Sequence, residues 1–267
     1  MIEAKKSLGQ NFLIDKNIIK KIIKIANINS NEHLVEIGSG TGSLSKELIK
    51  LNPKSLMLVE KDENLHKLLK DELHDNSKIS FINQDILKFN IEEKIKKNTI
   101  ILGNLPYNIS SQILIKMIKF KKWPPKYKKL VFMFQKEVAQ KLISDLNKKN
   151  FGRITIISNW RLKVKDYFKV SNKCFFPVPK VDSMIVVFEP TYHDSIKIKN
   201  IENLEKITQV FFSNKRKMIN KGFKRLFKDE NLANKTLKLN LSKRPSELSI
   251  FDYFKITEYF EKKKLDQ

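Results

Sequence analysis

A short apolar run that breaks into three alternating glycines is the feature that most limits what this chain can fold into. The run at residues 34–37 is followed by Gly38, Gly40 and Gly42, and residues 43–48 then show a helical pattern. Because glycine has no Cβ, the backbone there can turn with positive φ and a ligand can lie directly against it. The stretch therefore predicts a strand, a tight turn and a helix that together hold a nucleoside.

The spacing of these glycines argues against two common phosphate sites. It reads E-x-G-x-G-x-G, which differs from the G-x-G-x-x-G of dinucleotide enzymes, and no lysine follows it as a P-loop requires. Later apolar runs end at Glu60, near Asp85 and at Asn104. Ligands of open α/β sheets bind where the carboxyl ends of the strands meet, and Glu60 stands where such proteins place the acid that accepts from two ribose hydroxyls. These side chains are therefore expected in one site.

Apolar runs alternate with helical periods along most of the chain, which is typical of a parallel sheet with crossover helices. Strands are expected at residues 34–37, 56–59, 79–82, 99–103, 130–134, 162–170 and 184–188. An N-terminal helix capped by Asp15 should run to about Ala26. Around residue 193 the pattern changes, and only helical periods follow, at residues 204–212, 215–227, 232–237 and 250–260. We therefore expect one domain of residues 1–193 and a small helical domain of residues 194–267.

The charge of the chain points to a polyanionic partner. It has 53 lysines and arginines against 29 aspartates and glutamates, a formal net charge of +24. Such an excess predicts binding to nucleic acid, since a coding bias that favours lysine would not explain the shortage of acids. The segment at residues 120–129 mixes bases with aromatic residues and is either an RNA contact, through phosphates and stacking, or a solvated connector.

Other classes of protein are not expected from this composition. Cys174 is the single cysteine and the 4 histidines are scattered without ligand spacing, so neither a disulfide nor a metal site is predicted. The sequence has no apolar run near the roughly 20 residues of a membrane span, and residues 1–6 lack the apolar core of a signal peptide. We expect a cytoplasmic protein without a membrane partner.

Two further segments could border the nucleoside site. Residues 5–13, with Asn11 and Leu13, could fold over it as a flap, or they could form a plain N-terminal tail. Near the other end of the predicted sheet, two prolines fix the backbone after Phe175 and Phe176, so one of these rings is expected to be held rigidly.

The tetrapeptide that starts at Asn104 is the most informative for chemistry. The side-chain carbonyl of Asn104 and the backbone carbonyl of Leu105 can accept from both hydrogens of an exocyclic amine such as adenine N6, and Tyr107 offers a flat ring. The lone pair of that nitrogen is delocalised into the ring, and two acceptors favour the pyramidal geometry of the transition state without a general base. An adenine unstacked from RNA could lie between Tyr107 and Phe175. A purely structural turn is the alternative.

Several of these segments resemble known families. Residues 35–42, Glu60, residues 84–85 and residues 104–107 resemble the S-adenosylmethionine sites of class I methyltransferases. Together, the segments at residues 10–13, 104–110, 135–139 and 175–183 resemble the ribosomal RNA adenine dimethylase family over nearly the whole chain. Residues 212–220 and 244–249 are similar to the small-subunit branch of that family and not to its large-subunit resistance enzymes.

The resemblance implies a fold and a set of site residues. The fold is the Rossmann-like class I methyltransferase fold, α/β with a seven-stranded, mostly parallel sheet, plus a small all-helical C-terminal domain. S-adenosylmethionine would be the cofactor, and the residues implied to contact it are Asn11 and Leu13 from the flap, Gly38 at its methionine part, Glu60 at its ribose, Asp85 at its adenine amine, and Asn104. Asn104 and Leu105 would also bind the target amine, with the adenine held between Tyr107 and Phe175. The family commonly has proline where Ser39 stands, which should be harmless in a turn.

The implied activity is methyl transfer to N6 of two adjacent adenosines near the 3′ end of small-subunit (16S) ribosomal RNA, with a role in subunit biogenesis. The enzyme would act as a monomer on RNA in an immature 30S-type particle. Lys215, Arg216 and Lys217, expected together at a helix start, could clamp phosphate or could form a solvated basic face. Alternatives are a methylase of large-subunit RNA and a catalytically silent RNA-binding assembly factor.

Overall fold

The computed structural model of the chain describes residues 4–5, 8–74, 76–146 and 148–265. Residues 1–3, where no leader was expected, lie outside this part. Contacts group the chain into two compact units, Met1–Ala139 with Lys163–Pro190, and Gln140–Leu162 with Thr191–Gln267. The segment Gln140–Leu162 thus groups with the C-terminal helices, and the domain boundary near residue 193 stays a prediction.

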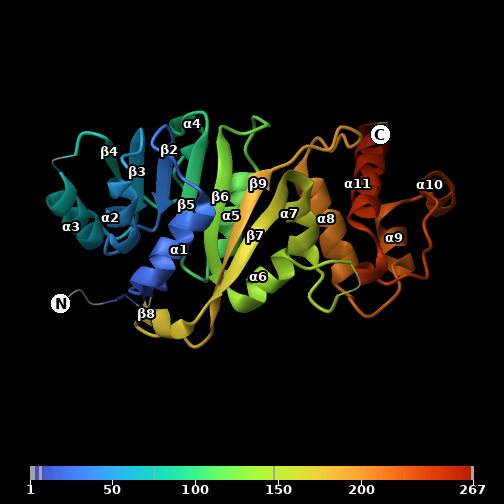
Figure 1. Cartoon of the computed structure of the whole chain (residues 1–267). Coiled ribbons are helices and arrows are strands. Elements are labelled where there is room, and N and C mark those ends of the chain that lie inside the picture. The colour runs from blue at the N-terminus through green and yellow to red at the C-terminus, as the bar shows by residue number, and fades with distance from the viewer. Residues whose placement is uncertain (1–3, 6–7, 75, 147, 266–267) are drawn as a thin grey trace. The chain divides into compact units, whose positions relative to one another are not determined.

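A seven-stranded sheet with the order β4-β3-β2-β5-β6-β9-β7 forms the centre of the first unit (Figure 1). Parallel pairing joins β2 to β3 and β5, β3 to β4, and β5 to β6, whereas β9 runs antiparallel to β6. The predicted mostly parallel sheet is confirmed. The strands are β2 (His33–Ile37), β3 (Ser55–Glu60), β4 (Ile79–Asn83), β5 (Thr99–Asn104), β6 (Tyr127–Gln135), β7 (Leu162–Val170) and β9 (Ser183–Pro190).

Helices cover both faces of this sheet, and in Figure 1 α1 crosses the near face while α5 lies behind the strands. The helices of this part of the chain are α1 (Lys16–Ala26), α2 (Ser43–Lys50), α3 (Glu63–Leu73), α4 (Ile91–Lys94), α5 (Ser110–Ile118) and α6 (Lys136–Leu142). Asp15 caps α1 as predicted, accepting from Asn17 N at 2.8 Å and from Ile18 N at 3.1 Å. The core cluster beside α1 and α2 contains Ile100 and Leu102 of β5, as the period of two in a strand requires.

A two-stranded sheet joins distant parts of the chain. Strand β1 (Phe12–Leu13) pairs antiparallel with β8 (Phe175–Phe176), which follows the short 3-10 helix η2 (Asn172–Cys174). The register places Leu13 opposite Phe175, and both side chains are buried in the core cluster. The N-terminal segment is therefore anchored to the first unit instead of forming a plain tail.

The described part of the second unit is mainly helical. Its helices are α7 (Arg153–Arg161), α8 (Ile201–Phe212), α9 (Asn220–Leu226), α10 (Glu230–Leu237), the 3-10 helix η3 (Pro245–Glu247) and α11 (Ile250–Leu265). The helix predicted over residues 215–227 starts later than expected, because Lys217 N donates to Asn214 O at 2.9 Å and closes a turn. Met218 fits the helical period, but it is 54% exposed and does not face the core. Its apolar character therefore led to a predicted helix start that is too early.

Two of the three aromatic rings in the mixed basic and aromatic segment at residues 120–129 belong to the core. Phe120 and Tyr127 are both buried, and the Tyr127 hydroxyl donates to Met117 O at 3.2 Å. Tyr127 already belongs to β6, which begins earlier than predicted. These two rings are therefore closed to RNA, whereas an RNA contact through the half-buried Trp123 or through the lysines of this segment stays a prediction.

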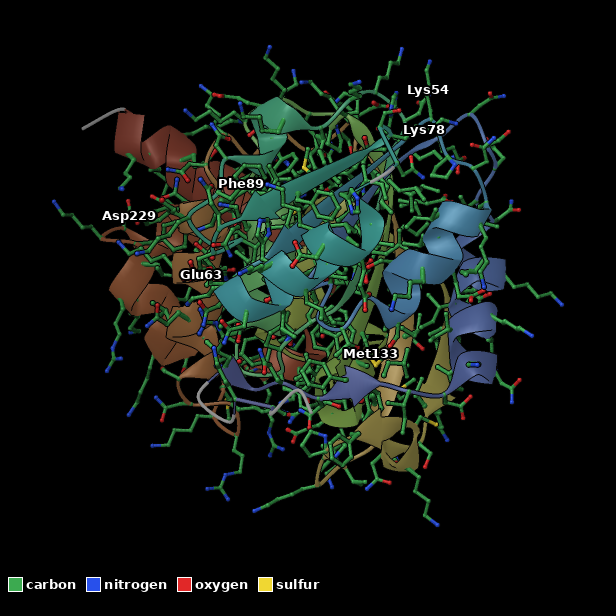
Figure 2. The ribbon with its side chains drawn as sticks, turned by 90° about the vertical axis from the view of Figure 1, so that its left-hand side faces the viewer. Lys54, Glu63, Lys78, Phe89, Met133 and Asp229 are labelled. Carbon is green, nitrogen blue, oxygen red and sulfur yellow. The ribbon has the colours of Figure 1, made fainter. Side chains whose placement is uncertain are left out.

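Charged side chains extend from the surface while the strands hold apolar ones. Figure 2 shows Lys54 and Lys78 among many nitrogen-tipped side chains at the surface, and Met133 of β6 is fully buried. Within the described part of the chain, we find no helix with the length and apolar character to cross a lipid bilayer.

Candidate active site

A cavity opens at the carboxyl ends of β2, β3 and β5. It encloses about 1200 Å³ when the open solvent in its mouth is counted. Eight residues singled out from the sequence line it, namely Asn11, Leu13, Gly38, Glu60, Asp85, Asn104, Leu105 and Tyr107. The expectation that polar residues after successive strands share one site is therefore matched by the geometry.

The glycine turn forms the floor of this cavity. Gly38 has φ 73° and Gly40 has φ 56°, a region of backbone conformation that side chains with a Cβ rarely adopt. Gly38 N donates to Val59 O at 2.8 Å, which fixes the turn against β3. A Cβ on Gly40 would lie 3.2 Å from the ring of Phe12, so the floor and the N-terminal segment approach closely.

Glu60 ends β3 with both carboxylate oxygens held by backbone donors. Gly40 N donates to Oε2 and Asp62 N donates to Oε1, each at 2.9 Å. Burial raises the pKa of Glu60 above its ordinary value, and these backbone hydrogen bonds oppose the rise. A carboxylate oxygen can accept more than one hydrogen bond, so Glu60 can still receive hydroxyl donors from the cavity.

Glu36 is a second acid at the cavity, and sequence reasoning gave it no role. It lies on β2 and is fully buried, and the Ser45 hydroxyl donates to its Oε2 at 2.5 Å. Burial raises the pKa of Glu36 to about 8, and the Ser45 bond only partly offsets this. The signal in the sequence was an acid inside an otherwise apolar strand.

Asp85 is the acid that follows β4. Its Oδ2 pairs with Lys61 Nζ at 2.9 Å and its Oδ1 accepts from Leu87 N at 2.9 Å. Burial alone would raise the pKa of Asp85, but Lys61 and the Leu87 amide together lower it below its ordinary value. Asp85 is therefore an ionised acceptor at the rim of the cavity.

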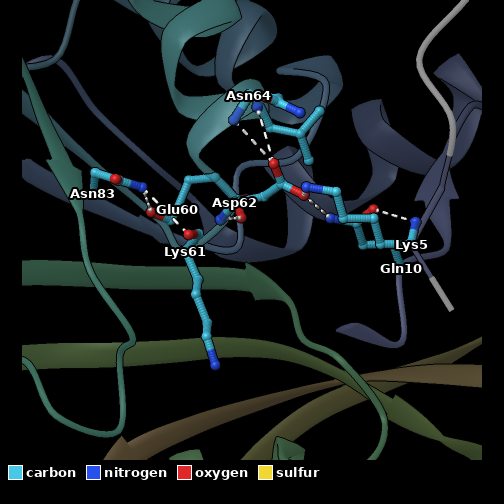
Figure 3. Close-up of polar contacts among 8 residues, drawn as sticks. Lys5, Gln10, Glu60, Lys61, Asp62, Asn64 and Asn83 are labelled. Carbon is cyan, nitrogen blue, oxygen red and sulfur yellow. Dashed lines mark hydrogen bonds and ion pairs between the residues drawn. The ribbon is translucent and has the colours of Figure 1, made fainter. Parts of the chain in front are cut away.

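Asp62 fastens the N-terminal segment to the sheet, and sequence reasoning missed it. Its carboxylate receives Lys5 Nζ at 2.9 Å and Gln10 Nε2 at 3.1 Å (Figure 3). It also caps α3, accepting from Asn64 N at 3.0 Å. Burial would raise the pKa of Asp62, yet these donors lower it. The sequence indicated this role only through the position of Asp62, two residues after Glu60 and directly before a helix.

Asn104 connects the floor with the N-terminal segment. Its Nδ2 donates to Asn11 O at 2.8 Å, which sets the orientation of the amide. Among the described residues none donates a hydrogen bond to Oδ1, so this carbonyl is available as an acceptor. A Cβ on Gly38 would lie 3.5 Å from the backbone oxygen of Asn104, which shows how near this corner is to the glycine turn.

Two aromatic residues were expected to face each other beyond Asn104, and the structure brings one to the cavity. The Tyr107 hydroxyl lies 2.6 Å from Ser183 Oγ, and burial raises the pKa of Tyr107. Phe175 is only 1% exposed and is not among the described residues that line the cavity. Pairing with Leu13 turns its ring into the core. A role of Phe175 beside the target base stays a prediction without an accessible ring to support it.

The predicted phosphate clamp belongs to the second unit. Lys215, Arg216 and Lys217 are exposed in the turn between α8 and α9 and do not start a helix, which corrects the sequence prediction. Lys215 Nζ donates to Lys149 O at 3.1 Å. The turn presents three cations to solvent, and their contact with RNA stays a prediction.

Comparison with known proteins finds a matching family and similar sequences. Residues 1–262 match the family model described as ribosomal RNA adenine dimethylase. A ribosomal RNA small subunit methyltransferase A of Pelagibacter ubique is 42% identical over 97% of this chain and 98% of its own length. One of Mycoplasmopsis synoviae is 40% identical over 90% of this chain and 89% of its own length.

Solved structures agree on the fold. A dimethyladenosine transferase from Plasmodium falciparum superposes with a TM-score of 0.79 at 27% identity, covering 95% of this chain and 98% of that one. The 23S rRNA methyltransferase ErmE has a TM-score of 0.68 at 22% identity and covers 94% and 100%. The class I methyltransferase fold predicted for this chain is confirmed.

Proposed function

Because the chain belongs to the ribosomal RNA adenine dimethylase family, we propose that it transfers methyl groups from S-adenosylmethionine to N6 of two adjacent adenosines near the 3′ end of small-subunit ribosomal RNA. Relatives at 42% and 40% identity that carry a small-subunit name favour this RNA. A large-subunit target has weaker support, since the 23S rRNA methyltransferase is 22% identical and shares the fold alone. The carrying observation is the free Oδ1 of Asn104 beside the cavity.

The residues around the cavity fit S-adenosylmethionine by their chemistry. Glu60 offers carboxylate lone pairs to two ribose hydroxyls, Asp85 offers an acceptor to the adenine amine, and Gly38 leaves room for the methionine part. Asn11 and Leu13 would cover the cofactor from the N-terminal segment. When bound, this cofactor supplies a methyl group activated by a positively charged sulfur.

Asn104 and Leu105 would orient the target amine. Their side-chain and backbone carbonyls accept from the two hydrogens of adenine N6, which turns the nitrogen lone pair away from the ring and towards the methyl group. Nδ2 of Asn104 holds this orientation through Asn11 O. No side chain has to remove a proton first, because the nitrogen becomes acidic once it carries the methyl group. Tyr107 would hold one face of the base.

We also propose that the substrate is RNA within an immature 30S-type particle, and that the enzyme acts as a monomer in the cytoplasm. The formal net charge of +24 supports a large polyanion as substrate. Lys215, Arg216 and Lys217 would add phosphate contacts from the second unit. A catalytically silent assembly factor is less well supported, since Asn104, Glu60 and their fixed orientations would serve no purpose there.

Labelled S-adenosylmethionine and unmethylated small ribosomal subunits test this proposal. The protein should place label on two adjacent adenosines near the 3′ end of the small-subunit RNA, located by primer extension. Label on large-subunit RNA offered in the same mixture, or on neither RNA, would contradict it.

A further inference from the structure

Glu36 is a carboxyl group set in an apolar layer of the sheet. Its register partners are Leu58 on β3 and Leu102 on β5, and both leucines belong to the core cluster. Residues paired directly across strands share a face of the sheet, so these leucines flank the Glu36 side chain. Glu36 is only 2% exposed. Its ionised form is therefore unfavourable there, because apolar neighbours do not solvate a negative charge.

The hydrogen bonds of Glu36 leave one carboxyl oxygen for a ligand. The Ser45 hydroxyl of α2 donates to Oε2 at 2.5 Å. Among the described residues none donates to Oε1, and none of their basic side chains forms an ion pair with Glu36. Since Glu36 also lines the cavity, its second oxygen is the part of the carboxyl group that a bound molecule can reach.

The charges near Glu36 do not stabilise its ionised form. Glu60, at the end of β3, is the charged group that acts on it, and its negative charge adds to the effect of burial. On α2, Lys46 instead pairs with Glu72 of α3 at 2.7 Å. The cover contributes the uncharged Leu13 to the same cavity. A positive charge that stabilises the Glu36 carboxylate therefore has to come from the ligand.

Glu36 differs in this respect from the other acids of the cavity. Among the described residues that line it, three are acids, namely Glu36, Glu60 and Asp85. Glu60 holds a backbone donor on each oxygen, and Asp85 pairs with Lys61 at 2.9 Å. Glu36 has no such partner on Oε1, and it lies two residues before Gly38, where the methionine part of the cofactor is proposed to lie.

We propose that Glu36 binds the ammonium group of the methionine part, and that its carboxyl group releases a proton to solvent when the cofactor binds. The inference rests on the proposed function, because it assigns a partner to one group of the proposed cofactor. In the cofactor-free protein the carboxyl group keeps its proton, since burial raises the pKa of Glu36 to about 8. A neighbouring ammonium group favours the carboxylate. The ammonium keeps its own protons, and the proton of Glu36 passes to the buffer.

Calorimetric titration near pH 7, in buffers of different ionisation enthalpy, tests the inference on the full chain. The unaltered protein should release about one proton for each S-adenosylmethionine bound. Glu36→Gln keeps an acceptor for Ser45 but cannot ionise, so it should release none and bind the cofactor about tenfold more weakly, the effect of losing one hydrogen bond to a charged group. Glu63→Gln, on the exposed first turn of α3, is the control and should release as much as the unaltered protein.

A second variant keeps the test decisive if Glu36→Gln does not fold. Ser45→Ala removes the hydrogen bond that lowers the pKa of Glu36. The pH at which proton release is half complete should therefore move upwards in Ser45→Ala. An unchanged pH dependence in this variant would overturn the inference.

Two further ligands separate the positive charges of the cofactor. S-adenosylhomocysteine keeps the ammonium group without the charged sulfur and should release the same proton, whereas methylthioadenosine lacks the amino-acid part and should release none. Absence of proton release with S-adenosylmethionine, equal release in Glu36→Gln, or release with S-adenosylmethionine but not with S-adenosylhomocysteine would overturn the inference. Failure of the unaltered protein to bind S-adenosylmethionine at all would instead overturn the proposed function.

Discussion

The floor of the cavity and its cover are built in different ways. The floor consists of the glycine turn with Glu60, Asp85 and Asn104, and each of these lies at the carboxyl end of a strand of one sheet or directly after it. The cover is the segment at residues 8–13, held by contacts to residues far away in the chain, such as Asn11 O to Asn104 Nδ2. The sheet therefore fixes the floor, whereas a few polar contacts and one short strand pairing fix the cover. Substitutions in the floor should abolish function and those in the cover should modulate it.

The largest effect is expected at Asn104, where floor and cover meet. Asn104→Ala removes the acceptor for the target amine and should lower kcat by about 100- to 1000-fold, the range for loss of one group that stabilises a transition state. RNA affinity, measured by filter binding, should stay near that of the unaltered protein. Equal loss of methylation and RNA binding would show that Asn104 shapes the fold and not the reaction.

Glu60 tests the floor alone. Glu60→Gln replaces one carboxylate oxygen by a donor and should weaken S-adenosylmethionine binding by about 10- to 100-fold, because hydrogen bonds to charged groups contribute roughly 1.5–3 kcal/mol. Glu63→Gln, on the exposed first turn of α3, is the control and should leave the affinity unchanged. Calorimetric titration measures the affinity of each variant for S-adenosylmethionine. Equal affinities in both variants would show that Glu60 does not bind the ribose hydroxyls.

Glu36 predicts how the stability of the floor depends on pH. Its pKa is about 8 in the folded chain against an ordinary 4.5. Between these two pH values the carboxyl group of Glu36 is protonated in the folded state and ionised in the unfolded state. This contribution is complete below pH 4.5 and is lost as the pH rises to about 8, at about 1.4 kcal/mol per pH unit at most. Urea unfolding of the cofactor-free protein should show Glu36→Gln with a flatter pH dependence over that window. Parallel curves would refute the burial of a protonated Glu36.

Asp62 tests the cover, and its effect should be the smallest. Asp62→Asn keeps a good N-cap for α3 but loses the charge that holds Lys5. Since Lys5 is half exposed, the pair contributes about 1 kcal/mol or less, and dissociation of S-adenosylmethionine should accelerate about fivefold at most. Asp71→Asn, exposed on the same helix, is the control. An effect as large as that of Glu60→Gln would erase the distinction between floor and cover.

The sequence predicted the floor because its determinants are local. Glu60, Asp85 and Asn104 each follow an apolar run, and the parallel arrangement then brings strand ends together. The start of α1 was predicted from Asp15 in the same way, because a helix N-cap depends only on neighbouring residues. The seven strands followed from the same periodicity, with boundaries that differ by a few residues where buried Tyr127 extends β6.

The cover could not be predicted in the same way, because it depends on pairing between distant residues. Nothing near Phe175 or Phe176 says which ring faces the core, and the register with Phe12 and Leu13 decides it. From the sequence, Asp62 is recognisable only as the N-cap of a helix, and its ion pair with Lys5 becomes visible only in the structure. In the second unit, residues 215–217 were predicted to start a helix, whereas they lie in the turn between α8 and α9. Three consecutive charged residues add nothing to the apolar pattern, so the sequence did not indicate where the helix begins.

A crystal structure with S-adenosylmethionine bound tests the central claim most directly. We predict the ribose hydroxyls on Glu60, the adenine amine at Asp85, the methionine part over Gly38, and Oδ1 of Asn104 open towards the methyl group. A cofactor bound elsewhere, or Asn104 turned so that Oδ1 is packed against protein, would contradict the account.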